Sequence, residues 1–561
     1  MGLKQGHSHI MTRIKQTIVL VALFFGLCST SLVAKNFDTV SQAIITKAVK
    51  SQPKESYLRK IYEISGYRPI WVTQHSLTPL AKELLQRVTT DPLLEKNTKM
   101  YKNARMILAG DTTASIFGGK ESIGKHLKLE FKMSKLFRNY TNYTLYGMIH
   151  WDHFKVLFKR QAGLNDVYAD WEIYPRHTVS SLLRSILTGA NLNAEFDALT
   201  PKTRLYTNLT KKMSEYRRIA LSGQWPTIPV LPKLVRGQSN PSIPLIRKRL
   251  SLSGDLKECV VSDSLVYDQC LVDAVKRFQK RHGQEADGVI GTNTAKLLRQ
   301  NIAEILTKMQ LNLDRIKMMK RNDSGRHIMI NVPAFKLYFF EDGTIRQSMR
   351  TITGSKRHPT PIFSDTVETI VLNPYWNVPT SIIQKEMIPK LLRNKNAMSR
   401  EGIEVRNGWG PNAKKISPSS INWSQYRYSR SVPFRFAQVP GTRNALGKVK
   451  FLFPNKFSVY MHDTPTKHLF KRNVRAYSHG CIRLQKPREL LKTFSSFNQN
   501  VDYEKSKKTL KGRKQTYLSL NEKVPVDVAY LTSWVDPSGT LQIRNDIYGY
   551  DKMQLKYQRR Y

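Results

Sequence analysis

The sequence predicts a multidomain protein of the α+β class. Its first half places apolar residues at three- and four-residue spacing, as in LTPLAKELLQRV (77–88) and HTVSSLLRSILTG (177–189), which is typical of amphipathic helices. From residue 327 onward, β-type runs separated by turn signals predict strands instead. With 561 residues, of which 40% are hydrophobic and 10% aromatic, the chain is long enough for several domains with apolar cores.

The amino terminus has the order of a secretory signal. Two basic residues, Arg13 and Lys15, precede the apolar run IVLVALFFGL (18–27), and the small residues CSTSLVAK follow it. The apolar run is shorter than the roughly 20 residues that a membrane span needs. We therefore expect residues 1–34 to be a signal peptide for export; the alternative is an uncleaved signal that anchors the protein in the inner membrane.

Residues 36–235 are expected to form a helical scaffold domain. This segment contains no chemical signature, and we interpret Trp151-Asp152-His153 and the aromatic residues around Trp171 as core rather than site. The segment PTIPVLPKLVRGQSNPSIP (226–244), rich in proline, glycine and serine, indicates a boundary at its end.

Residues 236–302 are predicted to form a small helical domain, because the segments 245–254 and 271–300 are amphipathic. The second segment contains a turn at Asp287–Gly291, where glycines permit a tight backbone. The unit resembles the peptidoglycan-binding domain of wall hydrolases and transpeptidases. The residues that carry this resemblance are Phe278-Gln279, His282-Gly283 and the Asp287–Gly291 turn. The alternative is a helical spacer that has kept the fold and lost the binding.

The cysteine count points to one free thiol. Removal of the signal would leave Cys259, Cys270 and Cys481, an odd number in an exported protein. Cys259 and Cys270 lie eleven residues apart in the small domain and could close a local disulfide in an oxidising compartment. Cys481 would then stay unpaired. Alternatively, all three are buried thiols without a special role.

A connecting helix is expected over 303–326, followed by a β-rich domain over 327–555. The segment 327–354 has two β-type runs joined at Asp342-Gly343, a strong hairpin signal. The other strand-like pieces are TVETIVLNPYWNVP, KFSVYMHD and VAYLTSWVDPSGTLQIRNDIYGYD. The polar, basic and less regular stretch 382–436 is interpreted as an insertion that forms a lid over the site, or else a surface excursion without a catalytic role. KSKKTLKGRK (505–514) is expected to be a solvated basic loop.

Cys481, in the run Tyr-Ser-His-Gly-Cys-Ile-Arg, is the candidate nucleophile. A thiol attacks as the thiolate, and a nearby imidazole can take its proton. His479 would leave the same face of an extended segment, whereas His462, which ends a β-like run, could be brought opposite Cys481 by an adjacent strand. Spacing alone favours neither histidine. The amides of Gly480 and Cys481 could donate to an oxyanion.

The residues around Cys481 resemble the signature of the L,D-transpeptidase (YkuD) family. The signature segments are His462-Asp463-Thr464-Pro465 and Ser478-His479-Gly480-Cys481-Ile482-Arg483. Supporting segments are Thr360-Pro361, Asn373-Pro374-Tyr375-Trp376, Gln438-Val439-Pro440-Gly441 and Asn444-Ala445-Leu446-Gly447. The resemblance covers residues 327–550, and with the two preceding domains it is closest to the large YcbB type.

This resemblance implies a β-sandwich catalytic domain and a role for each signature residue. Cys481 would be acylated, and His462 would be the proton acceptor and donor. The implied supporting roles are His479 in shaping the pocket and polarising the intermediate, Asp463 in orienting His462 through its backbone carbonyl, Gly480 in the oxyanion site, and Tyr477, Ser478, Arg483 and Trp376 in substrate binding. A zinc site at these residues is disfavoured because no second cysteine accompanies Cys481. No metal or organic cofactor is expected.

The implied reaction forms 3→3 cross-links between peptidoglycan stem peptides, with release of D-Ala, in the periplasm. The alternatives are an L,D-carboxypeptidase or exchange enzyme, an enzyme that attaches a lipoprotein, and a wall-binding scaffold with a silent site. The formal charge of +49, from 91 Lys and Arg against 42 Asp and Glu, favours anionic envelope surfaces as further partners. No nucleic-acid module is recognisable, so nucleic acid is not expected. We expect a monomer, or transient association with other wall-synthesis proteins.

Overall fold

The computed structural model describes residues 37–110, 123–149, 169–170, 178–260, 262–319, 324–408, 413–429 and 431–558. The expected signal peptide and the aromatic residues at 151–153 and 171 lie outside these ranges. The chain divides into two compact units, one of Met1–His150, Ile173–Lys202 and Gln558–Tyr561, the other of Trp151–Glu172 and Thr203–Tyr557. Within the described ranges, none of the helices combines the length and apolar character needed to cross a membrane.

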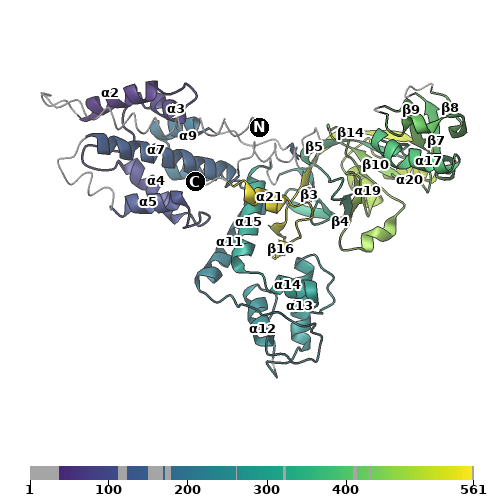
Figure 1. The fold of residues 1–561 in the computed structure, drawn as a ribbon, viewed down its shortest axis with the longest axis horizontal. Coiled ribbons are helices and arrows are strands. Elements are labelled where there is room, and N and C mark those ends of the chain that lie inside the picture. Colours follow the sequence, from purple (N-terminus) through teal and green to yellow (C-terminus); the bar gives the residue numbers. More distant parts are fainter. Residues whose placement is uncertain are drawn as a thin grey trace. The chain divides into compact units, whose positions relative to one another are not determined.

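The described part of the first unit is helical (Figure 1). Its helices are α2 (Phe37–Lys50), α3 (Tyr57–Ile64), α4 (Pro79–Thr90), α5 (Lys99–Leu108), α7 (Ile123–Tyr146), α9 (Val179–Leu187) and α10 (Leu192–Ala198). Threonine or asparagine side chains accept a backbone N–H at the amino ends of α4, α5, α9 and α10, as N-caps do. The predicted helices at 77–88 and 177–189 correspond to α4 and α9, and their apolar faces pack into one core.

A buried carboxylate holds this unit together. Glu130 on α7 is fully buried, and its Oε1 accepts from Tyr62 Oη at 2.8 Å and from the Ile70 amide at 2.9 Å. Its Oε2 accepts from the amides of Trp71 at 2.8 Å and Val72 at 3.0 Å. Burial raises the pKa of Glu130 to about 7, and the four hydrogen bonds oppose that shift.

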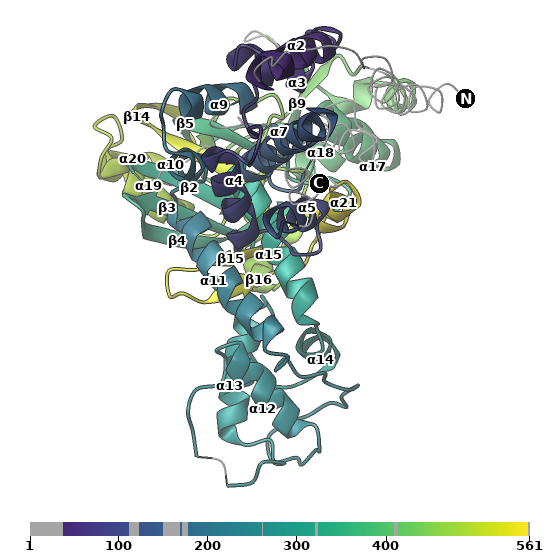
Figure 2. The same ribbon diagram turned by 90° about the vertical axis from the view of Figure 1, so that its left-hand side faces the viewer.

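The second unit begins with helices that form a small domain and its support. These are α11 (Arg204–Leu221), α12 (Ile243–Leu252), α13 (Gln269–Arg281), α14 (Thr292–Leu298) and α15 (Ile302–Lys317). The long helices α11 and α15 lie side by side, and α12, α13 and α14 pack together beyond them (Figures 1 and 2). Gln279 donates to Asp287 and accepts from the Gly288 amide, so the predicted turn is tied to α13. Gly288 has φ +75°, and a Cβ there would lie 2.8 Å from Val272.

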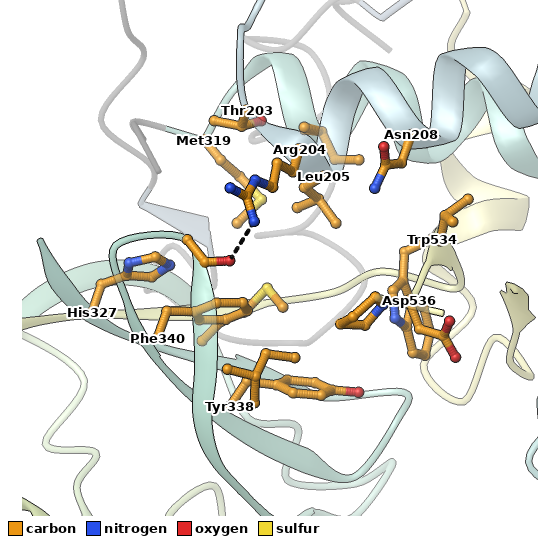
Figure 3. A pocket seen from close by; sticks show the side chains of 16 residues that line it. Thr203, Arg204, Leu205, Asn208, Met319, His327, Tyr338, Phe340, Trp534 and Asp536 are labelled. Carbon is orange, nitrogen blue, oxygen red and sulfur yellow. Dashed lines mark hydrogen bonds between the residues drawn. The ribbon is translucent and has the colours of Figure 1, made fainter. Parts of the chain in front are cut away.

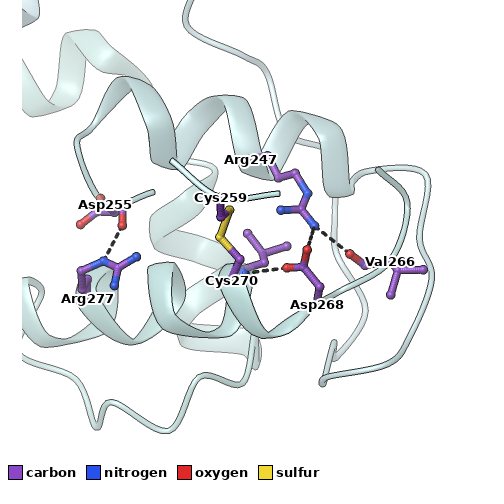
Figure 4. The surroundings of a disulfide bond; sticks show 8 residues. Arg247, Asp255, Cys259, Val266, Asp268, Cys270 and Arg277 are labelled. Atoms are coloured by element: carbon purple, nitrogen blue, oxygen red, sulfur yellow. Dashed lines mark hydrogen bonds and ion pairs between the residues drawn. A yellow bond between two sulfur atoms is a disulfide. The ribbon is translucent and has the colours of Figure 1, made fainter. Parts of the chain in front are cut away.

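A disulfide joins Cys259 to Cys270 at the start of α13, as Figure 4 shows. Arg247 on α12 ties down the same region, because it pairs with Asp268 at 2.8 Å and donates to the Val266 carbonyl at 3.0 Å. The loop between α12 and α13 is therefore held both covalently and by charge.

The β-rich domain is built on one sheet whose strand order closes on itself. The strands of the ring are β5 (Ile362–Leu372), β10 (Val449–Leu452), β11 (Met461–His462), β13 (Ile482–Leu484), β4 (Thr344–Gly354), β3 (Lys336–Glu341), β2 (Arg326–Asn331) and β14 (Thr516–Ala529). Pairing of β14 with both β2 and β5 closes the ring. β1 (Ala169–Asp170) adds to β5, and β12 (Ala476–Ser478) adds to β4. The predicted α+β class is confirmed. In the β-rich domain, the strands of this ring, which were expected to form a sandwich, belong to one sheet that closes on itself.

The remaining elements of this domain cover or extend the sheet. They are α19 (Pro487–Ser495), α20 (Tyr503–Lys511), the 3-10 helix η5 (Lys467–Lys471), the hairpin β15 (Ser533–Val535) and β16 (Leu541–Ile543), and α21 (Tyr550–Lys556). The hairpin predicted at Asp342-Gly343 joins β3 to β4, and both turn residues have positive φ, +49° and +73°.

The insertion is more regular than its composition indicated. β6 (Trp376–Asn377) and α16 (Thr380–Ile382) lead into it, and its further elements are the π-helical turn η2 (Ile383–Met387), α17 (Ile388–Arg393), α18 (Ala397–Arg400), β7 (Ile403–Asn407), β8 (Lys415–Ile416), η3 (Pro418–Ser420), η4 (Trp423–Tyr426) and β9 (Phe434–Gln438). β6, β9, β7 and β8 form a second sheet, and an apolar core around Trp423 and Phe436 fills the subdomain. Scattered apolar residues thus build a folded subdomain that short-range periodicity did not reveal.

Two local predictions were wrong. Residues 505–514 are mostly the helix α20 rather than a loop, because Asp502 caps it and Ser506 and Leu510, four residues apart, are buried on one face. In KFSVYMHD only Met461–His462 is strand. Ser458 before it has φ +54°, which ends any extended run.

Candidate active site

The strand register brings Cys481 and His462 to one face of the sheet. β11 pairs with β13 in parallel, with His462 opposite Arg483, so Tyr460 rather than His462 lies level with Cys481. Because side chains alternate along a strand, positions 460 and 462 share a face with positions 481 and 483. His462 is therefore the diagonal neighbour of Cys481 on that face, one strand across and two residues along.

His462 is buried and held in one orientation. Its Nδ1 lies 2.5 Å from the Asp463 carbonyl oxygen, and since a carbonyl only accepts, Nδ1 carries the proton. The Nε2 atom is then left as the acceptor. Burial lowers the pKa of His462 to about 3, with the nearby Arg483 guanidinium acting in the same direction. The imidazole is therefore neutral throughout the physiological range.

Cys481 is the free cysteine of the described residues, and it is partly exposed. Its Sγ donates weakly to the Ser458 carbonyl oxygen at 3.9 Å. Burial of the sulfur raises the pKa of the thiol, while hydrogen bonds from Tyr460 and the positive charge of Lys450 oppose the shift. The resting pair is thus a neutral thiol beside a neutral imidazole.

Lys450 and Tyr460 also belong to the site, although neither was predicted from the sequence. Lys450 on β10 lies opposite His462 in the register of β10 with β11, and its Nζ lies 3.7 Å from the centre of the Tyr460 ring. Burial lowers the pKa of Lys450 and raises that of Tyr460 well above its ordinary value. Tyr460 stands two residues before His462, so strand alternation could have identified it. Lys450 carried no comparable signal, because its position depends on the pairing of β10 with β11.

Asp463 makes contacts through both its backbone carbonyl and its side-chain carboxylate. Beyond its carbonyl contact with His462, its carboxylate accepts from the amides of Lys448 at 2.9 Å and Thr464 at 2.7 Å and pairs with the Lys467 ammonium. Gly447 has φ +60°, and a Cβ there would collide with the Asp463 carboxylate. These contacts fix the backbone that orients His462.

A tight turn, not an extended segment, separates His479 from Cys481. Gly480 has φ +112°, which favours glycine. Ser478 is buried, and its Oγ donates to the Cys481 carbonyl at 2.5 Å and accepts from the Gly480 amide at 3.2 Å. Thr360 donates to the Gly480 carbonyl at 2.8 Å. The Gly480 amide, expected to donate to an oxyanion, and Ser478, expected to bind substrate, are therefore both engaged in shaping this turn.

His479 faces the insertion. Its Nε2 lies 2.9 Å from Oε1 of Glu386 on η2, and its ring stacks on His358 with centroids 4.6 Å apart. Burial lowers the pKa of His358, and the neighbouring His479 acts in the same direction. His479, which was predicted to shape the pocket, thus joins the insertion to the turn Ser478–Cys481, which we call the signature turn.

The predicted substrate-binding residues lie in different surroundings. Arg483 is beside Cys481, and its Nη1 donates to Thr466 at 3.2 Å. Its Nε is buried without a partner among the described residues. Tyr477 is exposed on β12. Trp376 packs against the core of the insertion.

Neither a metal cluster nor the cavity in Figure 3 competes with this site. Among the described residues, no three His, Cys, Asp or Glu side chains are grouped as metal ligands. The cavity, of about 290 Å³, lies between β2–β4, the start of α11 and residues 534–537. Its lining includes the aromatic rings of Tyr338, Phe340 and Trp534 but neither Cys481 nor His462. We therefore place the candidate active site at Cys481.

Three family models match the chain. Residues 325–512 match the YkuD model, "L,D-transpeptidase catalytic domain". Residues 56–213 match "Scaffold domain", and residues 239–298 match "Putative peptidoglycan binding domain". These matches include both the residues around Cys481 and the small disulfide-bonded domain.

A curated relative, "Putative L,D-transpeptidase" of Haemophilus influenzae, is 30% identical over 252 residues. The match covers 45% of this chain and 49% of the relative, so the chain spans about half of that protein's length.

Solved structures of L,D-transpeptidases are also similar. One from Stackebrandtia nassauensis is 15% identical and covers 54% of this chain and 96% of its own, with a TM-score of 0.22. One from Mycobacterium smegmatis is 14% identical and covers 37% of this chain and 59% of its own, with a TM-score of 0.18. The chain thus contains a YkuD-type L,D-transpeptidase catalytic domain over residues 325–512 and a peptidoglycan-binding domain over residues 239–298.

Proposed function

We propose that this protein is a peptidoglycan L,D-transpeptidase that forms 3→3 cross-links through an acyl-enzyme on Cys481. The observation that carries the proposal is the pairing of β11 with β13. It sets a free thiol and a neutral imidazole on one face, and the Asp463 carbonyl leaves Nε2 of that imidazole free to accept a proton. A free thiol and an imidazole with an accepting nitrogen on the same face of the sheet support nucleophilic catalysis by cysteine.

In the first half-reaction, Cys481 Sγ attacks the carbonyl between the diamino acid and the terminal D-Ala of a tetrapeptide stem. The thiol proton passes to Nε2 of His462 as the S–C bond forms. His462 then returns that proton to the nitrogen of D-Ala, the C–N bond breaks, and a thioester remains on Cys481. Because burial disfavours both the thiolate and the imidazolium, the proton moves during the attack rather than before it.

In the second half-reaction, a side-chain amine of another stem attacks the thioester. The new amide forms, the C–S bond breaks, and His462 moves the amine proton to the departing sulfur. The two cations near the sulfur, Lys450 and Arg483, stabilise the negative charge as it develops on Sγ. Tyr460 stays protonated because its pKa is well above the ordinary value, so its hydroxyl remains a donor.

We place the protein in the periplasm. The signal-like amino terminus supports export, and the Cys259–Cys270 disulfide fits an oxidising compartment. The peptidoglycan-binding domain supports peptidoglycan as the partner that holds the enzyme at its substrate. The net charge of +49 supports additional attraction to anionic envelope surfaces.

The test is intact-mass spectrometry of the purified protein with a tetrapeptide muropeptide, together with analysis of the products. We expect an acyl adduct on Cys481, release of D-Ala and a 3→3 dimer, and all three are lost in Cys481→Ala. A carbapenem should form an adduct on the same residue. A Cys259→Ser/Cys270→Ser variant serves as the thiol control and should still be acylated. Cross-links formed by Cys481→Ala would refute the proposal.

A further inference from the structure

The insertion extends one carboxylate toward the signature turn. Glu386, on the π-helical turn η2, lies 2.9 Å from His479 through Oε1 and Nε2. Both side chains remain open to solvent, with 47% of Glu386 and 44% of His479 exposed. The pair therefore stands at the surface of the site, where an incoming molecule can reach it. Such π-helical turns are frequent at functional sites.

This carboxylate is unusual for its surroundings. The insertion, residues 382–436, contains eleven Lys and Arg but three acidic residues: Glu386, Glu401 and Glu404. Glu401 pairs with Lys390 at 2.6 Å and Glu404 with Arg406 at 2.7 Å, so both are neutralised inside the subdomain. Glu386 is instead directed out of it, to an imidazole.

The backbone turn that carries His479 is held next to the nucleophile. His479 is two residues before Cys481, and the turn between them is held by the Ser478 and Thr360 hydrogen bonds described above. His358 stacks against the ring of His479 and limits its rotation. The charges around Cys481 are thus divided. Lys450 and Arg483 act on Cys481 itself, whereas Glu386 lies at the His358–His479 pair, where Lys385 and Arg357 are also close.

We propose that Glu386 and His479 form the subsite for the primary ammonium of the acceptor. This inference rests on the proposed function. A lysine-like amine has a pKa of about 10.4, so it arrives as an ammonium and cannot attack a thioester until it has lost a proton. The Glu386 carboxylate attracts that cation beside the acylated cysteine.

The protons balance in two steps. The bound ammonium gives one proton through the Glu386–His479 pair to solvent, and the neutral amine then attacks the thioester carbonyl. As the C–N bond forms and the C–S bond breaks, the second proton passes through His462 to the sulfur of Cys481. Water or an uncharged nucleophile needs neither the carboxylate nor the first step. The pair therefore favours transfer to an amine over hydrolysis.

The experiment compares Glu386→Gln with the unaltered full-length protein. Each protein is acylated with a tetrapeptide muropeptide, and the thioester is then partitioned among water, hydroxylamine, which is uncharged at neutral pH, and the side-chain amine of Nα-acetyl-lysine. We expect Glu386→Gln to lower transfer to the lysine amine about tenfold, through loss of a charge contact. Transfer to hydroxylamine, hydrolysis and the rate of acylation should change by less than about twofold, because they involve no cationic acceptor.

The matched control is Glu401→Gln, which removes the same charge from the same subdomain. It should leave every partition ratio unchanged. Equal loss of transfer to all three acceptors in Glu386→Gln would overturn the inference, because it would show a role in shaping the site. Unchanged transfer to the lysine amine would overturn it as well. If the unaltered protein forms no acyl-enzyme, it is the proposed function that fails, and the inference fails with it.

Discussion

Two buried polar clusters, one in each unit, differ in how completely their hydrogen bonds are satisfied. Glu130 in the helical unit accepts four hydrogen bonds, from Tyr62 and from three consecutive backbone amides. His462 in the β-rich domain is also buried, yet its ring makes one hydrogen bond through Nδ1 to the Asp463 carbonyl and leaves Nε2 as an acceptor.

This difference separates a structural group from a chemical one. A buried ion is tolerated when donors surround it, and every donor adds to the cost of moving it. Glu130 therefore fixes residues 70–72 against α7 and has no capacity left for another partner. His462 and Cys481 have that capacity, since both are neutral at rest and each can change its charge when a substrate arrives.

The largest expected effect comes from removing the acceptor nitrogen of His462. His462→Gln should lower the acylation rate of Cys481 by about 10²- to 10⁴-fold, the usual contribution of general acid–base catalysis. The fold should persist, because a glutamine amide can still donate to the Asp463 carbonyl. Stopped-flow acylation and circular dichroism test the two halves of this prediction. Acylation within tenfold of the unaltered rate would show that another group takes the proton.

Glu130→Gln should lower stability and leave the acylation rate nearly unchanged, the opposite of His462→Gln. At pH 8 the glutamine NH₂ would face amides that need an acceptor, so we expect a loss of about 2–4 kcal/mol in the stability of the helical unit. Acylation of Cys481 below the unfolding transition should stay within about twofold, because Glu130 has no part in the chemistry. Denaturant unfolding followed by Trp71 fluorescence, beside the acylation assay, measures both.

The control for this substitution is Glu63→Gln, which breaks an exposed ion pair with Arg59 on α3. It should cost about 0.5 kcal/mol or less. An equal loss for the two variants would mean that the four hydrogen bonds to Glu130 contribute little, and the contrast between the two clusters would disappear.

Much of the fold could be predicted because its signals are local. The periodicity of 77–88 and the Asp342-Gly343 turn each determine a short stretch of backbone, and the structure has a helix and a hairpin there. The insertion could not be predicted in this way. Its core joins Val378 to Phe436 across more than fifty residues, and its sheet pairs β6 with β9, so no short window contains the pattern.

The site shows the same limit. Sequence spacing left both His479 and His462 as candidate bases for Cys481, and only the family resemblance favoured His462. In the structure, the contact that orients His462 is with its own neighbour, Asp463, whereas Lys450, twelve residues before His462, comes from the adjacent strand β10. Glu386 comes from a separate subdomain. Contacts between distant segments are set by tertiary packing, which a single sequence does not display.

The pH dependence of acylation should sharpen the comparison. The pKa of His462 is lowered to about 3, so its acceptor form is complete above that value, and the raised pKa of Cys481 keeps the thiol protonated to high pH. The acylation rate should therefore vary by less than about twofold between pH 5 and 8, without a step near the ordinary histidine value of about 6.5. A step in that range would show that a preformed thiolate–imidazolium pair exists at rest.

The smallest expected effect concerns Lys450, the cation nearest to the Tyr460 ring. Its charge opposes the rise in the pKa of Cys481, so Lys450→Met should move the thiol pKa further upward. Alkylation by iodoacetamide at pH 8 should slow about threefold, since less thiolate is present. Lys523→Met, which removes a cation paired with Glu368 on β5, should leave the rate unchanged. If alkylation slows equally in both variants, general surface charge rather than a positioned ammonium stabilises the thiolate. His462 and Arg483 would then be the remaining groups near Cys481 with a specific role in its chemistry.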